Sequence, residues 1–192
     1  MIPAFLLPNT NVAVLKQLFI YICSMVKENI VNLVPAVFAE DSRVWIFQSS
    51  RAFIEKEEKE INEQLCQFYK QWLSHNNPVK GWAGLLFRQF IVVMADETGE
   101  MTGGCSIDGM MRVVKSLERQ YDVNFFDRMM ITFLVKNKAE MLPFSQVQYA
   151  IDKGFIDKDT LLFNNVVNNK KELLENWLVP LNKSWMAGRL NF

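Results

Sequence analysis

Histidine and cysteine are scarce in this sequence, and their scarcity limits the chemistry that it can support. The 192 residues include one histidine, His75, and three cysteines, Cys23, Cys66 and Cys105. Zinc, iron and copper sites are normally built from clustered histidine and cysteine ligands, so we expect no metal site and no cofactor. The cysteines are odd in number and lack a C-x-x-C pair, which favours reduced thiols in a cytoplasmic protein over a disulfide framework.

The chain also lacks an excess of charge and a long apolar run. Lys plus Arg and Asp plus Glu number 21 each, so binding to nucleic acid has no electrostatic support. Residues 18–26 are strongly apolar but too few to span a bilayer. We expect residues 1–29 to be a leader, either poorly ordered or an upstream extension of a protein that starts at Met25. A buried N-terminal helix is the alternative, because apolar residues recur at helical spacing over 12–22.

Apolar residues are abundant, at 50% of the chain with 15 Phe and 5 Trp, which excludes disorder. We expect a single domain over 30–192, with a core at 42–136. Residues 43–48, 79–87, 90–95 and 129–135 are predicted strands, and 53–74 and 106–121 are predicted amphipathic helices. The unbroken apolar run of 90–94 predicts a central strand. This order, β-α-β-β-α-β, predicts an α+β fold with a ferredoxin-like split βαβ core: an antiparallel sheet with helices on one face.

A small α/β extension is expected at 137–192. Residues 139–142 are predicted to pair with the strand before them, and a helix at 145–153 should end at Gly154. A strand at 160–163 and a helix at 170–177 should follow. We expect Trp185 to dock on the body of the protein, because an exposed tryptophan is costly.

A glycine-rich loop at 99–108 (GEMTGGCSID) is the most informative segment for function. It follows an apolar strand and leads into a helix. Phosphate groups often bind at such a helix N-terminus, and reactive thiols are often found there. Gly99, Gly104 and Ser106 match the phosphate-binding pattern G-x-x-x-x-G-K-[ST], but Cys105 occupies the position of the lysine.

The loop has three catalytic candidates. Cys105 is the candidate nucleophile, since a helix N-terminus stabilises a thiolate, and His75 is the candidate base, with Asp108 as the third. The alternatives are that Cys105 is a small buried residue, that Ser106 and Asp108 cap the helix, and that His75 ends the helix before it.

The same loop is a candidate anion site. Helix N-terminal amides bind anions, and arginine provides the charge partner. The binding candidates are Gly103, Gly104, Ser106, Arg51, Arg88 and Arg128. The alternative for Arg128 is a surface ion pair with Asp127 or Asp122.

Several segments resemble an uncharacterised bacterial family of small proteins, some of them labelled "ABC transporter ATPase". The resemblance covers roughly residues 30–192 and rests on 43–51 (RVWIFQSSR), Trp72-x-x-His75, 104–108 (GCSID), 125–128 (FFDR), 163–165 (FNN), Trp177-x-x-Pro180 and Ser184-Trp185. It implies no particular mechanism. An ATPase needs the phosphate-binding lysine that Cys105 replaces. It also needs a magnesium-binding acid after the phosphate-binding loop, whereas Asp96 comes before the glycine loop. A second segment, 143–163, is similar to the latter part of GYF-like peptide-binding domains, without their aromatic-glycine start.

Three hypotheses of function follow. The first is binding of a small anionic ligand at loop 99–108, whether by a binding protein or by an enzyme. The second is a protein-interaction or scaffold module that uses residues 137–192, which a flat apolar patch near Trp177 and Trp185 would favour. The third and weakest is ATP hydrolysis.

Overall fold

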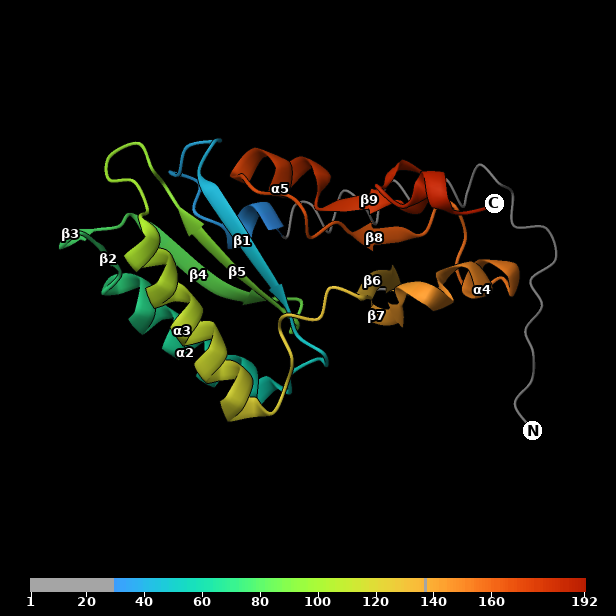
Figure 1. The fold of residues 1–192 in the computed structure, drawn as a ribbon, viewed down its shortest axis with the longest axis horizontal. Coiled ribbons are helices and arrows are strands. Elements are labelled where there is room, and N and C mark those ends of the chain that lie inside the picture. The colour runs from blue at the N-terminus through green and yellow to red at the C-terminus, as the bar shows by residue number, and fades with distance from the viewer. Residues whose placement is uncertain (1–29, 137) are drawn as a thin grey trace. The chain divides into compact units, whose positions relative to one another are not determined.

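The computed structural model describes residues 30–136 and 138–192. The chain divides into two compact units, Met1–Ala36 and Val37–Phe192. In the first unit, residues 30–33 are helical and the Val34 N–H donates to the Ile30 carbonyl at 3.2 Å. The predicted leader at 1–29, with its expected start at Met25, lies outside the described residues. The strands described below all belong to the second unit (Figure 1).

The first sheet of the second unit has three antiparallel strands in the order β1-β5-β4. These strands are β1 (Arg43–Gln48), β4 (Gly81–Leu86) and β5 (Phe90–Ala95). Every residue of β5 is buried, as expected for a central strand with apolar side chains on both faces.

Helices α2 (Glu55–Lys70) and α3 (Gly104–Tyr121) lie side by side against one face of this sheet (Figure 1). Their buried residues include Ile61, Leu65, Met110, Val114 and Leu117, which join the odd-numbered residues of β5 in one core. Ile54, which falls inside the predicted helix 53–74, is instead the N-cap of α2 and is exposed. The helix also ends earlier than predicted, at Lys70.

The opposite face of β5 is covered by aromatic side chains from the C-terminal part of the chain. The Phe90 ring packs 4.6 Å from Phe163 and 5.3 Å from Trp177, between ring centroids. Trp177 is fully buried and donates its indole N–H to the Asn165 side-chain oxygen at 2.9 Å. Trp177 therefore contributes nothing to a flat apolar patch of the kind that would favour the interaction-module hypothesis.

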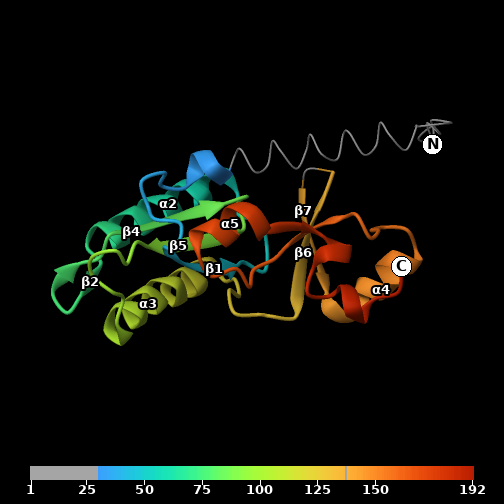
Figure 2. The ribbon, with the colours of Figure 1, turned by 90° about the horizontal axis from the view of Figure 1, so that it is seen from above.

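A second antiparallel sheet has the order β7-β6-β8-β9. Its strands are β6 (Met130–Val135), β7 (Lys138–Pro143), β8 (Leu161–Phe163) and β9 (Leu178–Pro180). Figure 2 shows β6 and β7 running across the direction of β4 and β5. The predicted pairing of residues 139–142 with the preceding strand is present as β6–β7.

The α+β class is confirmed, but the ferredoxin-like topology is not. The strands β1, β4 and β5 have the pairing that a split βαβ unit requires, with β1 next to β5. The predicted fourth strand, β6, should lie beside β1 and instead pairs with β7 and β8. The reason lies in its buried residues: Ile131 and Phe133 pack in a separate core with Val147, Leu162 and Leu181.

Short helices complete the C-terminal part. These are α4 (Val147–Asp152), α5 (Lys170–Asn176) and the 3₁₀ turns Phe144–Gln146, Leu181–Lys183 and Ala187–Arg189. Gly154 follows α4 with φ +70°, which is the left-handed conformation predicted for a helix stop. Trp185 is 47% exposed, and its ring contacts Phe144 at 6.1 Å between centroids and the Arg189 guanidinium at 5.8 Å, so it is only partly docked.

Candidate functional site

His75 lies at the tip of a small hairpin, not at the end of a helix. Strands β2 (Leu73–Ser74) and β3 (Asn77–Pro78) pair with each other across His75 and Asn76, whose φ angles are 49° and 67°. Two left-handed residues in a two-residue loop are typical of a type I′ turn, which matches the twist of a hairpin. The structural alternative, in which His75 ends the preceding helix, is therefore wrong.

This hairpin packs on the glycine-rich loop. The Ser74 hydroxyl donates to the Met101 carbonyl at 2.8 Å and accepts from the Gly103 N–H at 3.4 Å. A Cβ atom on Gly103 would lie 3.0 Å from His75 Nε2, so the absence of a side chain at Gly103 lets the imidazole approach. The structure thus places His75 beside Gly103 of the loop, but among the described residues it shows no hydrogen bond between His75 and Cys105.

Cys105 and Asp108 are both exposed near the start of α3. They are three residues apart and therefore lie on the same helix face. The alternative in which Cys105 is a buried packing residue is wrong. Asp108 lies beyond the first turn of α3, where the structure has no acidic residue, so it does not cap the helix.

Ser106 has a structural role that differs from the predicted cap. The N-cap of α3 is Gly103, and the Ser106 hydroxyl donates to the Gly103 carbonyl at 2.7 Å. The Ser106 carbonyl accepts from the indole N–H of Trp72 at 2.9 Å, so this buried residue ties α3 to the end of α2.

Arg51 does not reach the glycine loop. It forms a bidentate ion pair with Glu57, at 2.8 and 2.9 Å, and donates to the Tyr121 carbonyl at 3.0 Å. Tyr121 is the last residue of α3, whose 18 residues place it about 27 Å from the loop. Hydrogen bonding from Arg51 lowers the pKa of Glu57 to about 2.

Arg88 and Arg128 are also displaced from the predicted anion site. Arg88 lies in the turn between β4 and β5 and donates to the Phe53 carbonyl at 2.6 Å, at the opposite end of β5 from the loop. Arg128 lies in the connection between α3 and β6, and it forms no ion pair with Asp127, Asp122 or any other residue of 30–136 and 138–192.

Carboxylates, in place of arginines, surround the glycine loop. Glu97 accepts from both the N–H and the hydroxyl of Thr102, and Glu100 accepts from the Asn77 side chain at 3.0 Å. Asp96 is buried and accepts from Lys80 Nζ at 2.5 Å, which holds the pKa of Asp96 well below its usual range. These negative charges oppose the binding of an anion by Gly103, Gly104 and Ser106.

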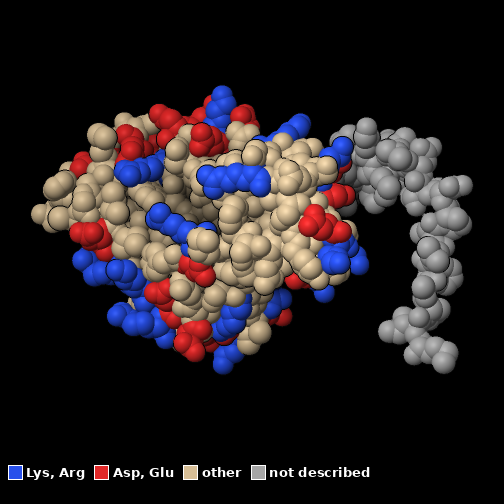
Figure 3. Space-filling model, turned by 45° about the vertical axis from the view of Figure 1, so that its right-hand side comes forward, with Lys and Arg blue, Asp and Glu red and all other residues tan. Residues whose placement is uncertain are grey.

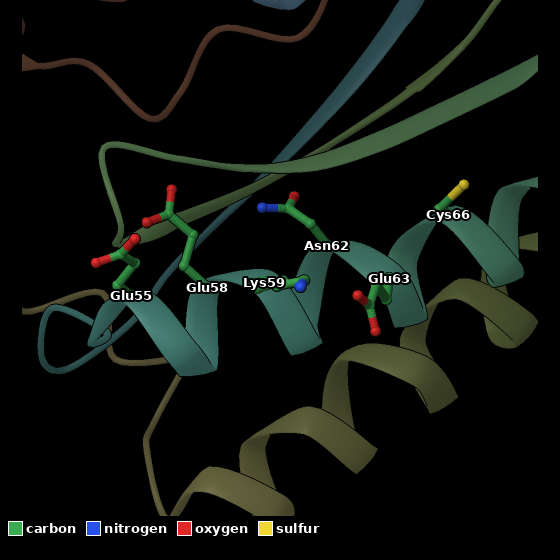
Figure 4. Close-up of a pocket in the computed structure, with 6 residues that line it drawn as sticks. All are labelled: Glu55, Glu58, Lys59, Asn62, Glu63 and Cys66. Atoms are coloured by element: carbon green, nitrogen blue, oxygen red, sulfur yellow. The ribbon is translucent and has the colours of Figure 1, made fainter.

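A shallow groove runs along α2. Figure 4 shows that its six lining side chains, Glu55, Glu58, Lys59, Asn62, Glu63 and Cys66, all come from this one helix. Asn62 has a structural role, since its Oδ1 accepts from the Leu85 N–H of edge strand β4 at 2.9 Å. Hydrogen bonding with Tyr69 lowers the pKa of the Cys66 thiol.

A second cavity, here called the junction cavity, lies where β1, the α3–β6 connection and the second sheet meet. Its volume is about 480 Å³. Its lining residues are Ile46, Phe47, Gln48, Phe125, Phe126, Asp127, Arg128, Met130, Ile131, Thr132, Leu162, Phe163, Asn165, Val166 and Trp185. The cavity occupies the side of β1 at which the fourth strand of a split βαβ sheet would pair, so it exists because β6 joins the other sheet.

Gln48 and Asn165 of the junction cavity are ordered by hydrogen bonds, whereas Thr132 is not. Gln48 donates to the Met130 carbonyl at 3.2 Å and accepts from Asn165 Nδ2 at 2.9 Å. Thr132 is fully buried on β6, and its hydroxyl has no hydrogen-bond partner in the part of the chain that the structure describes. Sequence reasoning missed Gln48, Thr132 and Asn165, and only the short polar interruption of an apolar strand at Thr132 signals one of them.

Comparison with protein-family models, curated proteins and solved structures gives no match for this chain. The resemblance described above therefore stays a prediction. The described residues contain no cluster of three or more His, Cys, Asp or Glu side chains that could hold a metal ion. Within the same residues, no helix is both long and apolar enough to cross a membrane.

Proposed function

We propose that the protein binds a small organic molecule in the junction cavity. The observation that carries this proposal is the hydroxyl of Thr132, which is buried and has no partner among the described residues, in a residue that lines the cavity. Leaving such a group without a partner costs about 1–3 kcal/mol. A ligand that hydrogen-bonds to this hydroxyl would recover that free energy on binding.

The walls of the cavity favour a ligand with an aromatic or otherwise apolar body. Among the aromatic residues that line the cavity, Phe47 and Phe163 are buried, whereas Phe126 and Trp185 are exposed. Ligand sites of about 300–1,000 Å³ that are mostly apolar and contain a few ordered polar groups are typical of small-molecule binding. The junction cavity, at about 480 Å³, fits this description.

This proposal keeps the predicted binding of a small ligand but places it in the junction cavity instead of the glycine loop. The glycine loop lacks the three arginines and carries Glu97 and Glu100, so electrostatics there oppose an anion. Figure 3 shows basic and acidic side chains interspersed over the face that it draws, without a large field of one sign. Recognition by shape and specific contacts inside the cavity is favoured over capture by surface charge.

The test separates binding from stability through one isosteric change. Thr132→Val removes the hydroxyl and keeps the shape of the side chain. Because this hydroxyl has no partner among the described residues, we expect the variant to unfold at the same temperature or higher. A library of aromatic and heteroaromatic fragments, screened by thermal shift on the wild type, supplies the probes. The fragments that bind should lose about tenfold in affinity for the variant.

A second pair of variants locates the site. Val166 is 66% exposed and lines the cavity, so Val166→Trp should occlude the opening. Val37 is 79% exposed and does not line the cavity, so Val37→Trp is the matched control. Fragments should bind the control and not the occluded variant. Fragment binding that is unchanged in both Thr132→Val and Val166→Trp, or the absence of any binding fragment, would contradict the proposal.

A further inference from the structure

The outer edge of β1 faces the junction cavity with part of its backbone unpaired. In an antiparallel strand, alternate residues point their N–H and C=O groups to opposite sides. The Ser49 N–H donates to the Gln89 carbonyl at 2.8 Å, so odd-numbered residues of this segment face β5. The N–H and C=O groups of Ile46 and Gln48 therefore point away from β5, and both residues line the cavity.

Other parts of the chain cover both ends of this edge but not its middle. At one end, the Val44 N–H donates to the Asn168 carbonyl at 2.8 Å. At the other end, the Ser50 N–H donates to the Asn124 carbonyl at 2.9 Å. Within 30–136 and 138–192, the backbone groups of Ile46 and Gln48 that face outward have no partner. The uncovered stretch between the two ends is on the order of 20 Å long.

A free strand edge is a template for another extended chain, because its unpaired donors and acceptors alternate at the spacing of a β-ladder. At Ile46, a backbone N–H donor and a C=O acceptor, both unpaired among the described residues, lie side by side on the same edge of the strand. A peptide in extended conformation pairs with both groups at once through one of its residues. The length of the open edge accommodates about three to five residues.

Arg128 adds a charge requirement to this edge. It lines the cavity, is exposed, and has no ion-pair partner among the described residues. Asp127, the other charged residue of the lining, accepts from the Met129 N–H at 2.8 Å. Guanidinium groups bind carboxylates through paired hydrogen bonds. A carboxylate at the end of a chain that is paired with β1 satisfies Arg128 for any peptide sequence, whereas an internal segment can do so only with an acidic side chain.

We propose that the ligand of the junction cavity is the C-terminal end of an extended peptide. The peptide adds to β1 as a strand by pairing with Ile46, its terminal carboxylate binds Arg128, and its side chains occupy the aromatic part of the cavity. This assignment rests on the proposed function, because it names the ligand class of the same cavity.

The experiment uses the full-length protein and mixtures of N-acetyl tripeptides. One mixture carries free C-terminal carboxylates, a second the same sequences as C-terminal amides, and a third free carboxylates with the central amide N-methylated. Binding is measured by affinity-selection mass spectrometry. The selected acids should bind, and their amides and N-methyl analogues should bind about tenfold more weakly or less, since each loses one charged or backbone hydrogen bond. In a ¹⁵N-labelled protein, the amide resonances of Ile46 and Gln48 should shift on binding.

Two variants complete the design. Arg128→Gln should abolish the preference for the acid over the amide, while Arg112→Gln, a change at an exposed arginine on α3 outside the cavity, should keep it. Equal binding of acids and amides, or of parent and N-methylated peptides, would overturn the inference. If aromatic fragments bind the cavity but none of the peptides do, the inference fails and the proposed function stands. If neither class binds, both fail.

Discussion

Replacing Asp96 by asparagine tests whether this buried acid is structural or catalytic. Asp96 follows β5 immediately, is 1% exposed, and accepts four hydrogen bonds. Its Oδ1 binds the N–H and hydroxyl of Thr98, and its Oδ2 binds Lys80 and the Ala39 N–H. We expect Asp96→Asn to destabilise the protein. Asparagine has one side-chain oxygen, which can accept from only one of the two sets of donors, and its NH₂ group then faces the donors of the other set.

The magnitude follows from the two sets of bonds. An asparagine that keeps its oxygen toward Thr98 places its NH₂ group against the Ala39 N–H and the Lys80 ammonium. Losing a hydrogen bond to a charged acceptor costs about 1.5–3 kcal/mol. Lys80 is 52% exposed and can turn to solvent, so its ion pair contributes at most about 1 kcal/mol. We therefore expect a loss of about 2–3 kcal/mol and a fall in melting temperature of about 5–10 °C.

Urea unfolding at several pH values provides the measurement, with Lys80→Gln as the control. The Lys80 interaction lowers the pKa of Asp96 below its usual 3.8, so the carboxylate stabilises the fold fully above that pH. The stability difference between wild type and Asp96→Asn should be constant at neutral pH and shrink as the pH falls below 3.8. The control should cost less than about 1 kcal/mol. An Asp96→Asn variant as stable as the wild type, or a control that costs equally much, would refute this reasoning.

Three further predictions follow from the same structure. Because Arg51 lowers the pKa of Glu57 from 4.5 to about 2, Glu57→Gln should lower the free energy of unfolding by about 1 kcal/mol above pH 4.5. Urea unfolding should show this loss disappearing as the pH falls toward 2, and a loss that persists in acid would contradict the prediction. Cys105, which is exposed, should alkylate faster at pH 8 than the half-buried Cys66, because access to the thiol outweighs the lowered pKa that the hydrogen bond with Tyr69 gives Cys66; peptide mapping after labelling measures both, and equal rates would argue against a reactive loop thiol. The protein should not hydrolyse Mg-ATP, because Cys105 replaces the lysine of the phosphate-binding pattern; steady phosphate release that is lost on changing Ser106 would disprove this.

Local sequence signals determined where most secondary-structure elements lie. Strand 43–48 has the predicted bounds, and the all-apolar run at 90–95 is the buried central strand that its composition indicates. Gly154 ends a helix in the predicted left-handed conformation. These features depend on the spacing of neighbouring residues and on the conformational range of glycine, so they can be inferred without knowing the rest of the fold.

Tertiary structure alone decided which elements pair and what lies in the site. The β6 strand has the same unpaired backbone groups whichever sheet it joins, and its choice depends on packing with Val147, Leu162 and Leu181, which lie far along the chain. That choice left the edge of β1 at Ile46 open and created the junction cavity. Arg51 and Arg88 were assigned to the glycine loop from charge alone, but backbone carbonyls and glutamates at the other ends of α3 and β5 bind them. Hydrogen-bond partners and strand neighbours are set by contacts between residues distant in sequence, and a linear pattern does not encode them.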